Sequence, residues 1–554
     1  MVKFRIYGFA LMATTFAAKA QDLSQATKAI DAEQYEKAKT LLKQSFSANP
    51  ANGKSAFLLG NIYLKQEVVD SAKIYFEKGL AAPNAGKLNS IGLAQIDLNA
   101  DNVAAAQAKF DAVVKDLKKK DTEEYVFIAR ALMNADKPDY KKAITYLTKA
   151  KEINPSDTQV LLALGDAYYG ERDQNNAYSA YRSAFYIDNT LIRAKMQMGV
   201  LLKGAKAYNE AMNAFNEVIG LNANYGPVYR EMAETYYLWA SNQPKTYDEN
   251  IAKALSSYTK YMELTDYSLA SRMRHADFLV LAKDYKALEA EANEMKKLDK
   301  VNPRVLRYLG YASYENGNVD GAISALNEYF VKGKKFIGYD YYYLGLAKIK
   351  KAIGADGKTV DATLLNSGIA ELKKAVETQP SIASSFNELG VGYFKQKLYN
   401  VSSPILETAL LSSENKNVFE DNMYYAISVF SENRLKDLKD MDKVAMDKAD
   451  KAFDRVIVER PEYPDSYLYK ARLNSSLEKD DVMAVNYQKF LDITLAKPAD
   501  VVEKNKAKII EAYNSLGAHF ANSDKTKAKE FFGKTITLDA TNKYALESLE
   551  KLKK

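Results

Sequence analysis

Residues 158–188 read TQVLLALGDAYYGERDQNNAYSAYRSAFYID, and this stretch decides the fold. Apolar and small residues recur three or four positions apart in each half, which places them on one face of each of two helices. The polar residues 170–176 (GERDQNN) separate the halves and predict a turn. Gly165 and Ala177 are small, so we expect two helix backbones to approach closely there, with Tyr181 filling the space between one hairpin and the next.

The small residue that opens the second helix returns regularly along the chain. Eight of the thirteen intervals between these positions are 34 residues. A period in the range of about 20–50 residues is typical of a solenoid, in which each unit stacks on its neighbours. The positions are Ala38, Ala72, Ala106, Ala143, Ala177, Ala211, Ala254, Leu288, Ala322, Gly368, Ser402, Ala449, Met483 and Ala528.

The repeat resembles the tetratricopeptide repeat, in which Leu-Gly is followed by Tyr, Ala, an aromatic residue, Ala and a late Pro. The residues that carry the resemblance include Leu164, Gly165, Tyr168, Ala177, Tyr181 and Ala184; Leu59, Gly60, Tyr63, Ala72 and Phe76; Met198, Gly199, Ala211 and Phe215; and Leu389, Gly390, Tyr393 and Ala409. The late Pro is matched by Pro50, Pro155, Pro380 and Pro461. The resemblance covers residues 21–554. It implies an all-α fold, a right-handed α-solenoid of about fourteen helix-turn-helix repeats.

The N-terminus has the pattern of a secretory signal peptide. A basic start is followed by the apolar run 6–18, and residues 18–20 (AKA) fit the cleavage rule. We expect cleavage after Ala20, so that the mature chain begins at Gln21. The run is too short for a transmembrane helix. The sequence therefore predicts an exported protein, placed most readily in the periplasm of a diderm bacterium.

Four longer intervals predict insertions into a single solenoid over residues 21–542. Residues 239–250 and 354–366 are expected to interrupt hairpins as loops, and residues 494–504 to lengthen a join between repeats. Residues 433–448 have apolar residues at three-residue steps and are expected to extend a helix. Residues 543–554 are expected to contain a capping helix, apolar on one side only.

The charge of the chain argues against a nucleic-acid partner. The formal charge is +7, and removal of Lys3, Arg5 and Lys19 with the signal peptide leaves +4. A nucleic-acid-binding protein needs a concentrated basic stripe. The densest run, residues 118–120 (KKK), is followed by acidic residues and is typical of a solvated helix end.

No group of residues in the sequence suits catalysis, a cofactor or a metal ion. The chain has no cysteine, and its two histidines, His275 and His519, lie far apart in a linear stack. Residues 48–55 and 352–359 match a loose phosphate-loop pattern, but they follow helices and have Ala in place of the first Gly. We therefore expect no enzyme activity, no cofactor and no metal site.

The resemblance also implies where a partner would bind, because the first helix of each repeat in that family lines a concave groove. The groove positions correspond here to Leu162, Asp166 and Tyr169; Arg230, Glu234 and Tyr237; Arg307, Tyr311 and Tyr314; and Tyr342, Leu346 and Ile349. Tyr and Arg dominate protein–protein hot spots. The candidate partner-binding residues are therefore Tyr169, Arg230, Tyr237, Arg307, Tyr311, Tyr314 and Tyr342, the last four forming one partly exposed patch. The alternative is that these tyrosines only reflect a chain with 40 Tyr.

Three functions stay open on the sequence. The favoured one is a non-catalytic scaffold of the cell envelope whose groove holds a peptide or a partner protein. A glycan- or peptidoglycan-binding solenoid that uses the groove tyrosines is the alternative, and an enzyme is the least favoured. A clamp for a C-terminal carboxylate, known in some members of the family, is disfavoured because Phe57 takes the place of the Lys it needs.

Overall fold

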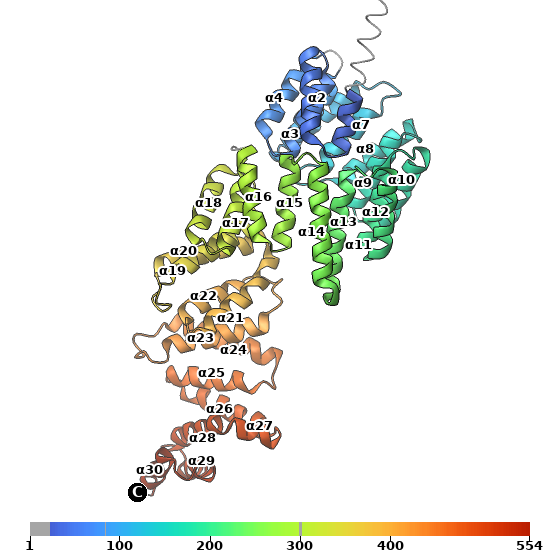
Figure 1. Cartoon of the computed structure of the whole chain (residues 1–554). Helices are drawn as coiled ribbons and strands as arrows, with labels where there is room; N and C mark the ends of the chain where they lie inside the picture. Colours follow the sequence, from blue (N-terminus) through green and yellow to red (C-terminus); the bar gives the residue numbers. More distant parts are fainter. Residues whose placement is uncertain (1–22, 83–84, 299–301, 554) are drawn as a thin grey trace, which may run out of the picture. The chain divides into compact units, whose positions relative to one another are not determined.

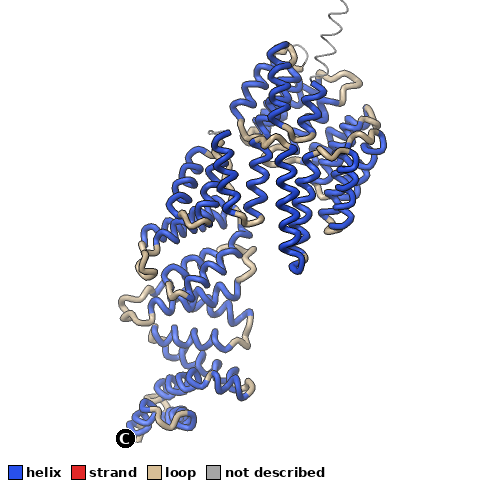
Figure 2. The backbone as a smooth tube through the Cα atoms, in the orientation of Figure 1, coloured by secondary structure: helices blue, strands red, loops and turns tan. Residues whose placement is uncertain are grey.

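A computed structural model describes residues 23–82, 85–298 and 302–553 of the chain (Figure 1). The predicted signal peptide, residues 1–20, lies outside these residues. The described chain is helical throughout, and its one β-type contact is an isolated bridge between Ile353 and Val360 (Figure 2). The helices form consecutive antiparallel pairs, as the all-α solenoid requires. We call the first helix of each pair the A helix and the second the B helix.

The chain divides into two compact units, residues 1–308 and 309–554. Unit 1 begins with an A helix over residues 23–31. Its further helices are α2 (Tyr35–Ala48), α3 (Gly53–Lys65), α4 (Val69–Leu80), α5 (Gly86–Asn99), α6 (Val103–Lys115), α7 (Glu123–Met133), α8 (Tyr140–Ile153), α9 (Thr158–Gly170), α10 (Gln174–Ile187), α11 (Ile192–Gly204), α12 (Tyr208–Leu221), α13 (Gly226–Asn242), η1 (Pro244–Thr246), α14 (Tyr247–Leu264), α15 (Leu269–Leu281), α16 (Tyr285–Leu298) and the first half of α17 (Arg304–Glu315).

Unit 2 continues the same pairing of helices. It comprises the second half of α17, α18 (Val319–Lys332), α19 (Gly338–Ala352), α20 (Ala362–Thr378), η2 (Pro380–Ser385), α21 (Phe386–Lys395), α22 (Tyr399–Ala409), α23 (Val418–Asn433), α24 (Lys443–Glu459), α25 (Pro464–Ser476), α26 (Asp480–Leu495), α27 (Ala499–Lys504), α28 (Lys506–Phe520), α29 (Lys525–Leu538) and α30 (Lys543–Lys551). Each of the fourteen B helices in the described chain contains one of the regularly spaced positions, which are occupied by larger residues at Leu288 and Met483.

The helix pairs meet where the sequence predicts small residues. Ala177 is completely buried, and a Cβ atom added to Gly165 would stand 2.3 Å from the Tyr181 ring. Any side chain at Gly165 would therefore push α9 away from α10. The same arrangement recurs one repeat later, where a Cβ atom on Gly199 would meet the ring of Phe215. The predicted packing of the repeat is thus confirmed.

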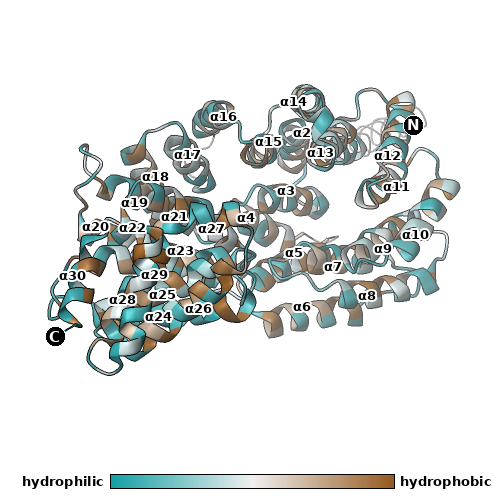
Figure 3. Ribbon diagram, turned by 90° about the horizontal axis from the view of Figure 1, so that it is seen from below, coloured by the Kyte–Doolittle hydropathy of each residue, from teal (hydrophilic) through white to brown (hydrophobic). Residues whose placement is uncertain are grey.

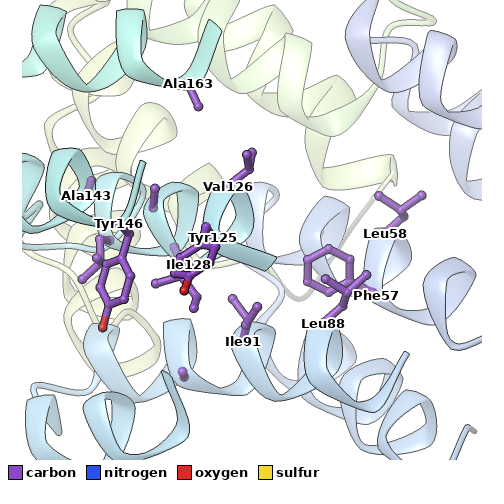
Figure 4. Packing of buried hydrophobic residues seen from close by; sticks show 14 of the residues in the cluster. Phe57, Leu58, Leu88, Ile91, Tyr125, Val126, Ile128, Ala143, Tyr146 and Ala163 are labelled. Carbon is purple, nitrogen blue, oxygen red and sulfur yellow. The ribbon is translucent and has the colours of Figure 1, made fainter. Parts of the chain in front are cut away.

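The largest apolar core joins the A and B helices of the first repeats (Figure 4). Phe57, Ile91 and Ile128 come from three successive A helices and are almost completely buried. Burial of each such side chain contributes about 1.5–3 kcal/mol. The core is thin and continuous, as expected for a stack of repeats.

Unit 1 departs from a simple stack because its first repeat also packs against its seventh and eighth repeats. The Gln34 side-chain amide donates to the carbonyl of Leu264, over a distance of 3.2 Å. Arg304, at the start of α17, forms a 2.9 Å ion pair with Glu67, which lies in the turn between α3 and α4 of the second repeat. These partners lie more than 200 residues apart in the chain, so the helix pairs of unit 1 form a closed turn.

The A helices line the inner side of this closed turn. In Figure 3, α5, α7 and α9 lie inside α6, α8 and α10. Successive A helices α3, α5, α7 and α9 also contact one another directly. Side chains that project from the inner faces of these helices therefore share one concave surface.

The first insertion differs from its prediction. Residues 239–250 do not interrupt the hairpin with an open loop, because α13 and α14 are each lengthened and joined by the short η1 turn. Ala240 and Asn250 are both buried, so the longer helices have a continued contact along their added length. That contact favours helix over loop.

The prediction of a helical extension at residues 433–448 is wrong for its middle part. Helix α23 ends at Asn433 and α24 begins at Lys443, with turns between them. The Asn433 side chain accepts a 3.0 Å hydrogen bond from the backbone N–H of Asp442, which closes the loop. Leu435 is 85% exposed, so this apolar side chain has no protein surface to pack against.

The remaining insertions form a loop and a short helix. Residues 353–361 are a loop between α19 and α20, with Gly357 at a φ of +65°, whereas residues 362–366, predicted as part of this loop, belong to α20. The join at residues 494–504 contains α27, and the helix expected near the C-terminus is α30. In the residues that the structure describes, no helix is both long and apolar enough to cross a membrane.

Candidate functional site

The structure corrects the predicted exposure of Arg307 and Tyr311. Both side chains are buried, and only 2% of Tyr311 is exposed. The Tyr311 hydroxyl donates a 2.7 Å hydrogen bond to the buried carboxylate of Asp340, and its ring stacks on Tyr343 with centroids 4.3 Å apart. Tyr311 is therefore a core residue of unit 2, because it lies on the face of α17 that packs against α19. The groove position of the family does not point to an open surface here.

Tyr314 and Tyr342 are half-buried in the same unit. The Tyr342 ring stacks on Phe386, with a centroid distance of 5.8 Å, and Tyr314 lies edge-on to Tyr343. Burial raises the pKa of Tyr314 above its ordinary value. These two rings are partly exposed, as predicted, and also have packing roles, but the predicted patch of four residues is not present because Arg307 and Tyr311 are buried.

The predicted residues of unit 1 fit the concave surface better. Tyr169, on the last turn of α9, is 39% exposed. Tyr237 is half-buried and donates its hydroxyl hydrogen to the carbonyl of Leu281 at 3.2 Å. Arg230 belongs to a group of charged side chains that extends over most of the A helices of unit 1.

We call this group the central ion cluster. Its members either form ion pairs with one another or alter one another's pKa. Their helices are the A helix over residues 23–31, α3, α7, α9, α11, α13 and α15, and Glu33 comes from the turn before α2. The cations are Lys65, Arg130, Arg193, Arg230 and Arg274, and the carboxylates are Asp31, Glu33, Asp166 and Glu231.

Glu33 is the buried centre of one half of the cluster. Its carboxylate pairs with Arg274, accepts a 2.7 Å hydrogen bond from the Tyr261 hydroxyl, and lies 3.7 Å from Nη2 of Arg230. Burial opposes ionisation of Glu33, but the charges of Arg274, Arg230 and Lys65 together hold its pKa well below the usual range. Glu33 therefore links the first repeat to the seventh and eighth repeats.

Asp166 is the centre of the other half. It accepts hydrogen bonds from Arg193 at 2.9 and 3.1 Å and from the Tyr181 hydroxyl at 2.9 Å. Both contacts come from Nη2 of Arg193, and this charge-assisted pairing holds the guanidinium on the concave surface. Beside it, burial raises the pKa of Asp31, although the charge of Arg193 opposes this shift.

Glu231 connects the cluster to a neighbouring pair. It lies 3.0 Å from Arg230 and 2.6 Å from Lys203, which also pairs with Glu234 at 2.7 Å. Burial raises the pKa of Glu231, but the charges of Arg230 and Lys203 outweigh it, so the net shift is downward. Each charge in this part of the cluster has a partner, as buried charges require.

Lys65 and Arg130 differ from the other cations of the cluster. No carboxylate of the described residues lies within 4 Å of either side chain. Lys65 lies over the Tyr35 ring at 5.4 Å, and Arg130 donates to the side-chain oxygen of Gln159 at 3.2 Å. Enclosure by the surrounding protein, together with the charges of Arg274, Arg193 and Arg230, lowers the pKa of Lys65 to about 8. Its side chain is nevertheless exposed to solvent.

Sequence reasoning identified Asp166 and Arg230 but missed most of the cluster. A signal for Arg130 is present, because it is the only charge in the apolar run 125–133 (YVFIARALM). A charge on an apolar helix face is costly unless it has a partner or a role. Glu33 gave no such signal, since its partners are distant in the chain.

The described residues hold no group of three or more His, Asp or Glu side chains placed to bind a metal ion. A separate hollow of about 670 Å³ lies in unit 2 between α26 and α28. His519 and Phe520 line it, and His519 lies 3.8 Å from the exposed Asp481. This hollow carries no convergent set of charged groups comparable with the central ion cluster.

Comparisons with known proteins identify the repeat at the start of the chain. Residues 23–86 match the tetratricopeptide repeat family. A search of curated proteins gives no match. Solved structures that resemble the chain include the C-terminal part of a TPR repeat-containing protein from Cytophaga hutchinsonii, with 21% identity over 50% of this chain and 99% of that one, at a TM-score of 0.31. A tetratricopeptide repeat protein from Parabacteroides merdae has 17% identity over 47% of this chain and 93% of its own, at a TM-score of 0.33.

A third structure is YrrB, described as a TPR protein with an unusual peptide-binding site, with 15% identity over 33% of this chain and 92% of that one, at a TM-score of 0.21. The family match falls on the first repeats, and the Gly, Ala and aromatic contacts of those repeats recur in later helix pairs. Residues 23–86 therefore carry a tetratricopeptide repeat, and the described helix pairs that follow repeat its packing.

Proposed function

We propose that this protein is a non-catalytic scaffold that binds a peptide or a segment of a partner protein on the A-helix surface of unit 1. The observation that carries the proposal is the convergence on that one surface of charged side chains from seven of the first eight repeats, including the eighth, which closes the turn. Tetratricopeptide repeats commonly serve protein–protein interaction, which supports a protein partner.

The charge distribution supports a binding role. A core that only had to fold would be more stable with apolar side chains, because paired charges seldom repay their desolvation. Arg193, Arg230 and Lys65 instead lie on A helices that line the concave surface, where long-range attraction would steer a charged partner and select it by complementarity. Tyr169 adds an exposed aromatic side chain on the same helix as Asp166.

The proposed compartment is the periplasm, and the proposed context is an assembly of the cell envelope. Support comes from the signal-peptide pattern of residues 1–20. The glycan-binding alternative is less well supported than the protein partner. Tyr311 cannot present a ring face to a sugar, because it is buried against Tyr343.

A charge reversal on the A-helix surface tests the proposal. Arg130→Glu on α7 is compared with Lys149→Glu, which makes the same change at an exposed site on the neighbouring B helix, α8. Each variant is used as bait in extracts of the source cells, and the retained proteins are measured by quantitative mass spectrometry. We expect Arg130→Glu to lose partners that the parent and Lys149→Glu both retain. Equal loss from both variants, or from neither, would contradict binding on this surface.

A further inference from the structure

The ends of the closed turn in unit 1 meet along one seam, between the first two repeats and the helices α13, α14, α15 and α17. Figure 3 shows α2 beside α13, α14 and α15. The backbone N–H of Lys37 donates a 3.2 Å hydrogen bond to the Asp266 carboxylate. The side-chain amide of Asn302 donates one of 3.0 Å to the carbonyl of Gln66. Together with the ion pairs and the amide contact described above, these bonds make the seam polar.

The apolar side chains that cross the seam include two small ones. Ala270 of α15 joins the core of the first repeats, and Ala32 packs against the core of the sixth and seventh repeats. Each alanine buries one methyl group, far less apolar surface than Phe57 or Ile91 buries within the stack. Polar contacts therefore have a larger share in closing the seam than in joining neighbouring repeats.

Arg304 has carboxylates on both sides of the seam. It lies 2.9 Å from Glu67, across the seam, and 2.6 Å from Asp277 of α15, on its own side. Its side chain is 20% exposed and that of Glu67 is 34% exposed, so salt can screen the pair. Loss of Glu67 would therefore leave Arg304 with a partner.

Arg230 is placed in the same way. It lies 3.7 Å from Glu33, across the seam, but 3.0 Å from Glu231 on its own helix α13. Arg274 and Glu33 would lose one another if the seam opened, but water would then reach both charges and solvate them. The cations of the seam are thus satisfied with the seam closed and with it open.

We infer that unit 1 opens and closes reversibly at this seam. A two-state element needs two arrangements of similar free energy, and the carboxylates on the side of Arg230 and Arg304 provide the second one. Because the A helices line the inner side of the closed turn, opening admits a segment of a partner to that surface from the side. This step rests on the proposed function and adds how access to the surface is regulated.

Spin-label distances measured by pulsed EPR test the opening. The chain has no cysteine, so a pair of engineered cysteines carries the labels at chosen sites. Thr40→Cys on α2 and Thr259→Cys on α14 are exposed and lie on opposite sides of the seam. The control pair, Thr145→Cys on α8 and Ser179→Cys on α10, is exposed within the stack. From about 0.05 M to about 1 M NaCl, we expect a longer-distance population across the seam to grow about fivefold and to revert on dilution, with the control pair unchanged.

Two substitutions at Arg304 have opposite expected effects. Glu67→Gln removes only the contact across the seam, so the open population should rise about two- to fivefold. Asp277→Asn keeps an acceptor for the Tyr308 hydroxyl but removes the charge that Arg304 retains in the open state, so the open population should fall by a similar factor. A residue that only supported folding would shift both variants in the same direction.

Chemical linking of the seam tests access. Lys37→Cys and Asp266→Cys, both at exposed sites, are joined by a short bismaleimide. The readout is the set of cell proteins that the parent retains and Arg130→Glu loses. Protein linked before mixing with extract should retain less than about a fifth of this set, whereas protein linked after mixing should retain it all.

Three results would overturn the inference. They are a seam distance that neither salt nor Glu67→Gln changes, an open population that grows in Asp277→Asn, and full retention by protein linked beforehand. The salt series needs no charge variant, so a variant that fails to fold does not remove the test. Failure of the proposed function looks different. Arg130→Glu then loses no protein and the access step fails with it, while the EPR distances still decide whether the seam opens.

Discussion

The closed turn of unit 1 predicts that Glu33 holds together repeats far apart in the sequence. The substitution Glu33→Gln keeps the size of the side chain and an acceptor for Tyr261 but removes the charge. It leaves Arg274 and Arg230, whose side chains are 26% and 19% exposed, without their shared counter-ion. Breaking a fully buried pair costs about 3–5 kcal/mol. Because these arginines keep some contact with solvent, we expect the free energy of unfolding to fall by only about 2–3 kcal/mol.

Amide hydrogen exchange with mass spectrometry is the suitable assay, because it resolves the elements that lose stability. A loss of about 2 kcal/mol corresponds to roughly thirtyfold faster exchange through local opening. We expect this acceleration in α2 and in the C-terminal half of α14, and no change in α8 or α10. The control is Glu77→Gln, which removes an exposed ion pair with Lys73 on α4 and should change stability by less than about 1 kcal/mol.

The pH dependence of the effect has a definite sign. The pKa of Glu33 is lowered by folding, so its contribution is complete above its ordinary value of 4.5 and is lost as the pH falls through the lower native pKa. The difference between parent and Glu33→Gln should therefore be constant near neutrality and shrink below about pH 4.5. Exchange in α2 of Glu33→Gln within twofold of the parent at pH 7 would refute the reasoning.

Three further predictions concern other parts of the chain. Ala177→Leu should lower the stability of unit 1 by about 1–3 kcal/mol in chemical denaturation, since its site is completely buried, and an unchanged midpoint would contradict the packing. Tyr311→Phe should destabilise unit 2 by about 1–3 kcal/mol by removing a donor from the buried Asp340, whereas an unchanged melting temperature with lost partner retention would show Tyr311 to be a binding residue. Mass analysis of the exported protein should give Gln21 as the first residue, and a mature chain that retains Met1 would exclude the signal peptide.

The fold could be predicted because it is repeated locally. Positions such as Gly165 and Ala177 are decided by contacts within one hairpin, and the same pattern recurs many times. Residues 433–448 show the limit of that reasoning. Their apolar spacing suited a helix, but an exposed Leu435 gains nothing from helix formation, and the Asn433 side chain stabilises a turn instead. Apolar periodicity predicts a helix only where another protein surface can cover the apolar face of that helix.

The candidate site could be predicted only in part, because it depends on contacts between distant repeats. Asp166 and Arg230 follow from the position of one helix in its own repeat. Glu33 reaches Arg274 only because the curvature of eight repeats brings the ends of the turn together. No local sequence pattern predicts this accumulated curvature. The groove rule failed at Tyr311 for a related reason, since the neighbouring helix α19 covers that face with Tyr343 and Asp340.

Photo-cross-linking from two tyrosine positions tests the central claim most directly. A photoreactive benzophenone amino acid replaces Tyr169 on the A helix α9, or Tyr186 on the B helix α10, which is 89% exposed and more accessible than Tyr169. The labelled proteins are irradiated in source-cell extract, and the cross-linked partners are identified by mass spectrometry. Binding on the A-helix surface of unit 1 predicts a specific adduct from position 169 that is absent from position 186. An adduct from position 186 and none from position 169 would contradict it.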